Sequence, residues 1–268
     1  GALARHHGID LLVPTVESEL LPLVEIADDL GAAGISLLSA RRPALETCLD
    51  KWATIQALAP ASYLPRTEVL DGGFDPASWQ FPAFVKPRRA SGSNGAATIP
   101  SAADLAGLPV DGSLMVQEML PGDEFSVDVL AIPEIRPRAV VRERLKIDSG
   151  IAVTSRILRS RALEEAAVDL VARVGAGPVA NVQFRRATDG APKLLEINPR
   201  IPGTIALTIA GGINMPELAA RSALGLRVSD PGEVAPVAMV RALEDRVVSL
   251  EDLQRMAEQS RVSAEVVA

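Results

Sequence analysis

Oxygen-bearing side chains are concentrated in the segment 181–200, which reads NVQFRRATDGAPKLLEINPR. Asp189 and Gly190 predict a β-hairpin with a two-residue turn, because this pair accepts the positive φ angles that such a turn requires. The turn also sets which residues of the two strands face each other. The predicted cross-strand pairs are Gln183 with Glu196, Val182 with Ile197, and Phe184 with Leu195.

Side chains alternate between the two faces of a strand, so this hairpin has one apolar and one polar face. The apolar face consists of Val182, Phe184, Leu195 and Ile197, and the polar face of Asn181, Gln183, Glu196 and Asn198. Carboxylate and amide oxygens are ligands that Mg²⁺ or Mn²⁺ prefers, with waters and substrate phosphates completing the shell. Arg200, one step further along the polar face, would add a planar cation for a phosphoryl or carboxylate oxygen. A solvent-exposed polar sheet face is the alternative interpretation.

A second candidate region lies upstream, where a short strand leads into a loop of small residues. The strand 83–86 ends at Lys86, and the loop 91–95 reads SGSNG. Glycine lets a backbone approach a phosphate closely, so such a loop can surround phosphate oxygens with N–H groups. A flexible turn is the alternative for the loop taken alone.

The run LLEINPR, following ANVQF, resembles the metal-binding signature of ATP-grasp ligases. The similarity is greatest to the branch that includes carbamoyl phosphate synthetase large chains and other carboxylate-amine ligases. It implies that Gln183, Glu196 and Asn198 bind the Mg²⁺ ions that bridge ATP phosphates. It also implies catalytic roles for Asn198 and Arg200, with Arg200 contacting the transferred phosphoryl group. The resemblance extends from the IDLLVPT segment to the Met239-Val240-Arg241 segment.

The same resemblance implies a nucleotide site. Lys51, in the pair Asp50-Lys51, and Lys86 would bind ATP phosphates, and the loop with Ser91, Gly92 and Ser93 would close over them. The segment Gln117, Glu118, Met119 and Leu120 would border the adenine, and Glu124 would hold the ribose hydroxyls. A surface lysine is the alternative for Lys51, and a structural hairpin is the alternative for Pro121-Gly122.

Composition excludes several classes of protein. The net charge of −7 and the pI of about 5.0 argue against a nucleic-acid surface. The chain has one cysteine and two histidines, and it contains no long apolar stretch, signal peptide, P-loop or dinucleotide fingerprint. We therefore expect a cytoplasmic protein with no membrane partner, and we interpret Cys48 as a packed apolar residue.

The expected fold is an α/β ATP-grasp architecture, in which two lobes clamp ATP. Residues 1–48 would be the remnant of a preceding doubly wound domain whose first strands lie before Gly1. Residues 49–118 would form the small lobe, 119–248 the large lobe and 249–268 a helical tail. Periodicity predicts strands over 9–14, 35–38, 83–86, 113–117, 125–132, 139–145 and 238–242, and helices over 15–30, 43–59, 101–108, 162–174, 216–224 and 249–259, with a loop over 146–154.

Two charged groups have open interpretations. Arg156, Arg159 and Arg161 precede a helix and could hold a carboxylate or a phosphate, or could be solvated surface. Glu17 and Glu19 lie beyond a strand end, where α/β sheets bind ligands, but the first turn of a helix also favours acids.

The expected activity is ATP-dependent ligation of a small carboxylate to an amine, an amino acid or a thiol, through an acylphosphate, with ADP and phosphate as products. A homodimer is also expected. The alternatives are an ATP-binding regulatory module, a fragment of a larger synthetase, and an enzyme similar to biotin carboxylase. The substrates themselves are beyond the sequence, because acceptor pockets are built from variable loops.

Overall fold

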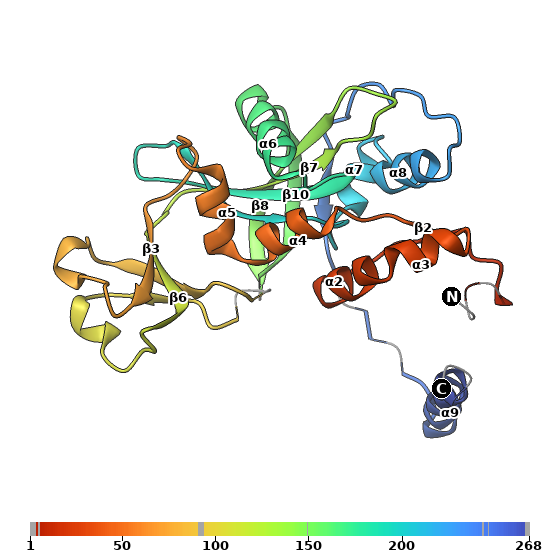
Figure 1. The fold of residues 1–268 in the computed structure, drawn as a ribbon, viewed down its shortest axis with the longest axis horizontal. Coiled ribbons are helices and arrows are strands. Elements are labelled where there is room, and N and C mark those ends of the chain that lie inside the picture. Colours follow the sequence, from red (N-terminus) through yellow and green to blue (C-terminus); the bar gives the residue numbers. More distant parts are fainter. Residues whose placement is uncertain are drawn as a thin grey trace.

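A computed structural model describes residues 4, 6–90, 94–148, 150–242, 244–245 and 247–265, with side chains up to residue 258. The described strands form a two-stranded, a four-stranded and a six-stranded sheet (Figure 1). The predicted loop residues Ser91, Gly92 and Ser93 lie outside the described residues. No helix among those described is long and apolar enough to cross a membrane.

The N-terminal segment forms the predicted strand–helix–strand crossover. Strands β1 (Leu11–Leu12) and β2 (Ser36–Leu37) pair in parallel. The predicted single helix between them is wrong, because it is divided into α2 (Glu17–Glu25) and α3 (Ala27–Ala32). Ile26 separates the two helices with φ −106° and ψ 16°, and its N–H bonds to the carbonyl of Leu23 at 3.3 Å, one residue short of the α-helical spacing.

The predicted helix over 43–59 is also two helices, α4 (Arg42–Leu49) and α5 (Lys51–Leu58). Asp50 between them has an extended backbone, and its carboxylate accepts hydrogen bonds from the N–H groups of Trp52 and Ala53. Aspartate favours this capping position over a helix interior, because its carboxylate satisfies free N–H groups. As a consequence, Lys51 is the first residue of α5.

The four-stranded sheet is antiparallel, with strand order β3-β6-β4-β5. Its strands are β3 (Thr67–Asp71), β4 (Ala83–Pro87), β5 (Ala97–Ile99) and β6 (Asp111–Glu118). Two 3₁₀ turns accompany it, η1 (Pro76–Ser78) and η2 (Ala102–Leu105). The helix predicted over 101–108 is therefore wrong, since only η2 forms there, behind a capping box of Ser101 and Asp104. Gly107, with φ +90°, follows η2 in a conformation that no helix continues.

The six-stranded sheet has strand order β11-β10-β7-β8-β9-β12, and all its neighbours are antiparallel. Its strands are β7 (Glu124–Leu130), β8 (Arg138–Asp148), β9 (Ile151–Leu158), β10 (Val179–Arg186), β11 (Pro192–Asn198) and β12 (Ala238–Val240). The loop predicted over 146–154 is wrong, because β8 and β9 continue through it as a hairpin. Gly150 supplies the turn with φ +78°.

Helix α6 (Arg161–Val174) covers one face of the six-stranded sheet and buries an apolar stripe, including Leu163, Ala167 and Leu170. Leu58 of α5 and Cys48 of α4 belong to the same core. Burial raises the pKa of the Cys48 thiol to about 12, which agrees with a packed residue rather than a nucleophile.

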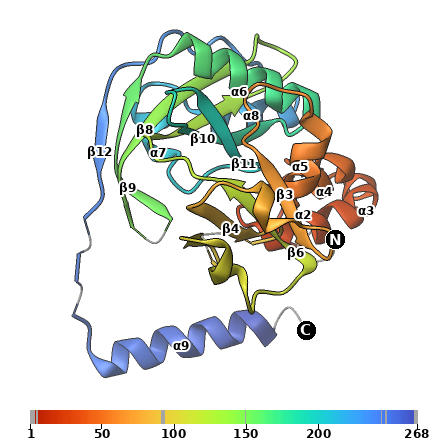
Figure 2. The same cartoon turned by 90° about the vertical axis from the view of Figure 1, so that its left-hand side faces the viewer.

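Beyond the hairpin lie α7 (Ala206–Ala210), α8 (Met215–Ala223) and α9 (Leu250–Glu265). Helix α8 is followed by a glycine in the left-handed region, Gly225 with φ +65°. Helix α9 begins behind Ser249, whose hydroxyl accepts a hydrogen bond from the N–H of Asp252 and donates one to its carboxylate. In Figure 1 and Figure 2, α9 lies apart from the three sheets.

Candidate active site

Strands β10 and β11 form the predicted hairpin, but its turn and its ladder each differ from the regular pattern. The turn is a three-residue loop, because Ala187 and Ala191 still pair and the N–H of Gly190 bonds to the carbonyl of Ala187. Gly190 has φ +81°, the left-handed conformation typical of such a loop. In the ladder, Phe184 faces Leu194 rather than Leu195, because β11 contains one extra residue at this point.

These two departures compensate for each other. The longer turn shifts the register by one residue, and the bulge at Leu195 shifts it back. Gln183 therefore faces Glu196, and Val182 faces Ile197, as predicted. The predicted Phe184–Leu195 pair is wrong, and Leu194 is the residue that enters the core. The carbonyl oxygen of Leu195 instead accepts a hydrogen bond from Lys86 Nζ at 3.3 Å.

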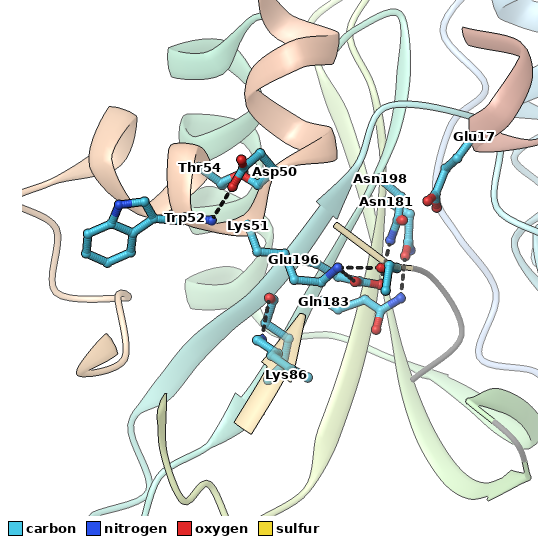
Figure 3. Close-up of polar contacts among 12 residues, drawn as sticks. Glu17, Asp50, Lys51, Trp52, Thr54, Lys86, Asn181, Gln183, Glu196 and Asn198 are labelled. Carbon is cyan, nitrogen blue, oxygen red and sulfur yellow. Dashed lines mark hydrogen bonds and ion pairs between the residues drawn. The ribbon is translucent and has the colours of Figure 1, made fainter. Parts of the chain in front are cut away.

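The polar face of the hairpin is not a solvated surface. Asn181 and Asn198 are 2% and 8% exposed. Asn198 Nδ2 donates to Glu196 Oε1 at 3.0 Å, and Gln183 Nε2 donates to Asn181 Oδ1 at 3.4 Å (Figure 3). The amide and carboxylate groups thus form a hydrogen-bonded pair on each strand, and the register places the two pairs side by side.

A buried ion pair lies next to this row. Asp128 on β7 is fully buried and accepts hydrogen bonds from Arg142 Nη2 at 2.6 Å, from Asn181 Nδ2 at 2.8 Å and from Thr208 Oγ1 at 2.5 Å. Arg142 on β8 is 1% exposed. A buried carboxylate needs such partners. They orient the Asn181 amide, and sequence reasoning did not single out any of Asp128, Arg142 or Thr208.

A cavity of about 390 Å³ lies between the four-stranded sheet and the six-stranded sheet. Five residues of the sequence-predicted site line it: Lys51, Lys86, Glu124, Gln183 and Glu196. Arg144 and Arg185 line it as well. Four cationic side chains and two carboxylates give this set a net charge of +2, which suits a polyanionic ligand.

Lys51 contacts the hairpin at Glu196, and Lys86 contacts it at the carbonyl of Leu195. Lys51 Nζ lies 3.6 Å from Glu196 Oε2 and donates to the carbonyl of Ala90 at 2.6 Å. Burial lowers the pKa of Lys86 to about 8, against the Glu196 charge, which raises it, while the Lys51 charge lowers it further. Lys86 is therefore a desolvated cation whose charge a bound anion would stabilise.

Arg144 is the clearest residue that the sequence analysis missed. It lies on β8, is 6% exposed, and forms an ion pair with Glu124 while donating to Gln183 Oε1 at 3.0 Å. It therefore connects the proposed ribose-binding carboxylate to the polar face of the hairpin. Arg142 and Arg144 lie at i, i+2, directly after the apolar run 139–141. That pattern was the available signal, since a buried strand rarely contains two charges on one face.

The structure does not bring every predicted residue to the cavity. Gln117, Glu118, Met119 and Leu120 lie at and beyond the end of β6 and are not among its lining residues. Gln117 Nε2 donates to Thr67 Oγ1, and Glu118 Oε1 accepts from the N–H of Arg66. The three arginines whose role the sequence left open do not line this cavity either. Each forms an ion pair with an acid: Arg156 with Glu143, Arg159 with Glu233, and Arg161 with Glu165.

The remaining predicted residues meet at the end of the hairpin. Arg200 Nη2 donates to Glu17 Oε1 at 2.9 Å. Glu17 lines a small recess together with Lys51, Glu196 and Asn198. Glu19 instead accepts hydrogen bonds from the N–H groups of Thr15 and Val16 at the start of α2.

The side-chain oxygens on the polar face of the hairpin are suitable ligands for a hard divalent cation. Gln183, Glu196 and Asn198 offer carboxylate and amide oxygens, and Glu196 has a cationic neighbour in Lys51. The described part of the chain contains no cluster of three or more His, Cys, Asp or Glu residues that could enclose a metal. In sites with phosphates, Mg²⁺ commonly takes part of its oxygen shell from the bound ligand.

The sequence model of the family described as ATP-grasp in the biosynthetic pathway with Ter operon matches residues 111–246, slightly more than half of the chain. No curated protein matches the chain significantly.

Three solved structures illustrate the likeness of the fold. Biotin carboxylase from Campylobacter jejuni has a TM-score of 0.73 at 14% identity, over 87% of this chain and 58% of that one. Pyruvate carboxylase from Rhizobium etli has a TM-score of 0.70 at 18% identity, over 86% and 22%. N5-carboxyaminoimidazole ribonucleotide synthetase from Thermus thermophilus has a TM-score of 0.67 at 24% identity, over 90% and 69%. The chain thus spans only part of the two carboxylases, and these matches support the predicted α/β ATP-grasp fold.

Proposed function

The chain belongs to the ATP-grasp family, and on this premise we propose that it is an Mg²⁺-dependent ligase that uses ATP to join a small carboxylate to an amine. The observation that carries the proposal is the cavity lined by four cations and two carboxylates, adjoining a row of hard oxygen ligands. A cavity of this charge favours a polyanion such as a triphosphate.

We also propose a role for each of four segments of the chain. Residues 49–118 would act as the small lobe and 119–248 as the large lobe that together clamp ATP, with 1–48 as a remnant of a preceding domain and 249–268 as a tail. The separate four-stranded and six-stranded sheets support this division. The packing of α5 in the core of the six-stranded sheet attaches the start of the small-lobe segment to the large lobe.

The nucleotide would be held by groups from both sheets. Lys51 and Lys86 would bind phosphate oxygens, and Ser91, Gly92 and Ser93 would belong to the loop that covers them. The segment 117–120 would meet the adenine edge, and Glu124 would hold the ribose hydroxyls. The position of Glu124 in the cavity supports its part of this assignment.

Gln183, Glu196 and Asn198 are proposed to hold Mg²⁺, which when bound offsets the negative charge of the β- and γ-phosphates. The residues of this chain supply the rest of the electrostatic stabilisation. Lys86 is already desolvated, so its interaction with a phosphoryl oxygen is not weakened by water.

The proposed reaction has two steps. A carboxylate oxygen of the substrate attacks the γ-phosphorus of ATP, and the bond to ADP breaks to give an acylphosphate. The amine nitrogen then attacks the acyl carbon, the bond to phosphate breaks, and the nitrogen loses a proton. Arg200 and Asn198 are proposed to contact the transferred phosphoryl group. Both steps redistribute charge over oxygens, so positioned cations rather than a nucleophilic side chain are needed.

ADP release in the presence of Mg-ATP, measured against panels of carboxylates and amines, tests this function. We expect release that requires both substrates. We also expect Mg-ATP to raise the melting temperature of the protein, and Lys86→Ala to reduce that shift. An ATP-binding regulatory module would show the thermal shift with no release for any pair of substrates.

Bicarbonate is the second candidate for the carboxylate. A structure described as the biotin carboxylase domain dimer of Hydrogenobacter thermophilus 2-oxoglutarate carboxylase, with MgADP, ADP and bicarbonate, matches this chain with a TM-score of 0.69 at 15% identity. Bicarbonate-dependent ADP release without an organic carboxylate would favour this candidate. A homodimer, which that description supports for the related domain, stays a prediction that light scattering can check.

A further inference from the structure

We propose that Glu17 is a positioning residue for Arg200, so that the N-terminal segment completes the side of the site where the phosphoryl group is transferred. The inference rests on the proposed function, in which Arg200 contacts that group. It adds a residue that lies 183 positions away in the sequence and in a different part of the fold.

The contact itself is a direct one. Arg200 Nη2 donates to Glu17 Oε1 at 2.9 Å, and the two side chains are 20% and 25% exposed. Arg200 Nη1 lies 3.4 Å from the carbonyl of Ile201, and its Nε is buried without a partner among the described residues. Glu17 is therefore the one side chain in the described part of the chain that accepts a hydrogen bond from this guanidinium.

Glu17 stands on a firmly packed element. It is the first residue of α2, whose Leu20 is fully buried in a cluster with Ala44 and Leu45 of α4. Figure 3 shows Glu17 directed from α2 toward the end of the hairpin at Asn198. Because α2 is anchored to α4, the core fixes the backbone position from which the Glu17 side chain reaches Arg200.

A free arginine side chain samples many rotamers, and ordering it costs conformational entropy that a reaction would otherwise have to supply. The Glu17 carboxylate holds one edge of the Arg200 guanidinium, so that the same plane is presented to a ligand each time. Small displacements of a positioned group lower reaction rates strongly. A surface ion pair that did not orient Arg200 would have no effect on the reaction rate. A pair that only neutralised the charge of Arg200 would lower the rate.

Three variants separate these possibilities. Glu17→Ala removes the acceptor, and Glu17→Gln retains an oxygen for the Arg200 N–H without the charge. Glu19→Gln is the matched control, because it removes the same charge from the same helical turn and has no contact with Arg200. We expect Glu17→Ala to lower kcat for ADP release about 10-fold or more, with the KM for ATP changed less than about twofold. Glu17→Gln should lie between Glu17→Ala and wild type, and Glu19→Gln should match wild type.

A measurement without turnover completes the test. Binding of ADP alone and of ADP with fluoroaluminate, which stands in for the transferred phosphoryl group, is titrated calorimetrically in the presence of Mg²⁺. Positioning predicts that Glu17→Ala weakens the fluoroaluminate complex about 10-fold while the affinity for ADP stays the same. A purely structural role would shift both affinities or neither, and would overturn the inference.

The outcomes also distinguish the inference from the function on which it rests. If the wild type releases ADP and Glu17→Ala equals or exceeds it, the inference fails and the ligase assignment stands. The other outcome is a wild type that forms no ADP from ATP with any substrate and whose affinity for ADP is not increased by fluoroaluminate. In that case the ligase assignment fails, and the role of Glu17 fails with it.

Discussion

The ammonium group of Lys51 lies 3.6 Å from the carboxylate of Glu196 and links it to the loop that follows β4, through a hydrogen bond to the carbonyl of Ala90. Lys51 begins α5, and Glu196 lies on β11. A residue from outside the hairpin thus balances the charge of the one carboxylate on its polar face. Both groups face the cavity, so a bound ligand would contact them together.

Glu196→Gln should separate catalysis from folding. The substitution keeps the size of the side chain on a half-buried polar face, so the melting temperature should change little. It removes the only negative charge proposed to hold Mg²⁺, so the rate of ADP release should fall about 10²-fold or more. The measurement is ADP release against Mg²⁺ concentration. Glu68→Gln on β3, outside the cavity, is the control, and superimposable curves for Glu196→Gln and wild type would remove the metal site.

Lys86 should couple nucleotide binding to proton uptake. Its pKa of about 8 in the free protein leaves it largely neutral above that pH, and a bound polyanion would raise the pKa. Between pH 8 and 10 the affinity for Mg-ATP should therefore fall, and the apparent binding enthalpy should depend on the ionisation enthalpy of the buffer. Lys86→Met should abolish this buffer dependence, and Lys193→Met should retain it. Buffer-independent enthalpies for the wild type would contradict the prediction.

The same lowered pKa has a consequence for folding. Between the pKa of about 8 in the folded chain and the ordinary value of 10.5, the unfolded chain binds more protons at this lysine. The contribution of Lys86 to the free energy of unfolding should therefore rise with pH across that window. Urea denaturation of wild type and Lys86→Met at pH 7 and pH 10 measures the difference.

Arg144→Met should weaken both the fold and the site. The change leaves the Glu124 carboxylate, whose next cation is Arg185 at 4.0 Å, without its closest partner. We expect the free energy of unfolding to fall by about 1–3 kcal/mol and nucleotide affinity to decrease. Arg156→Met on β9 is the control, because Arg156 is 57% exposed and such surface ion pairs contribute about 0–1 kcal/mol. Equal effects of the two variants would show that Arg144 has no special role.

Asp50→Asn should lower the free energy of unfolding at neutral pH, and this difference from wild type should disappear in acid. Burial alone would raise the pKa of Asp50, but hydrogen bonds from Arg88, the Ala53 N–H and Arg89 lower it below its usual 3.8. Its charge therefore stabilises the fold above that value, and the contribution disappears as the pH falls through the lowered pKa. Asparagine still caps α5, so the expected loss at pH 7 is about 1–3 kcal/mol from the ion pairs.

Denaturation of wild type and Asp50→Asn at pH 7 and below pH 3 measures this effect. Asp75→Asn serves as the control, because Asp75 caps η1 through the N–H of Ala77 in the same way. A difference between wild type and Asp50→Asn that does not narrow in acid would show that the charge of Asp50 is not the cause.

Local patterns predicted the elements well where the governing interactions are local. The alternation along β10 and β11, the glycine after α8 and the Ser249 cap all depend on residues within a few positions of each other. The Asp50 break was within reach of the same reasoning, since aspartate is a better cap than a helix-interior residue. The bulge at Leu195 was not, because it depends on packing against neighbouring elements, including the Leu194 N–H bond to the carbonyl of Tyr63.

Groups that complete the site from distant positions were harder to find. Arg144 reaches Glu124 because β7 and β8 are neighbours in the sheet, and Glu17 reaches Arg200 across most of the chain. Single residues of this kind resemble ordinary surface charges in the sequence. Their role follows only from strand order and helix packing, which short-range periodicity does not encode.

The extra residue of the hairpin can be removed without changing which residues face each other. Deletion of Leu195 would leave a regular ladder, in which Phe184 still faces Leu194 and Gln183 still faces Glu196. The deletion would nevertheless remove the carbonyl that accepts the hydrogen bond from Lys86. Among homologous sequences, chains that lack the bulge residue should therefore have replaced the lysine or given it another partner.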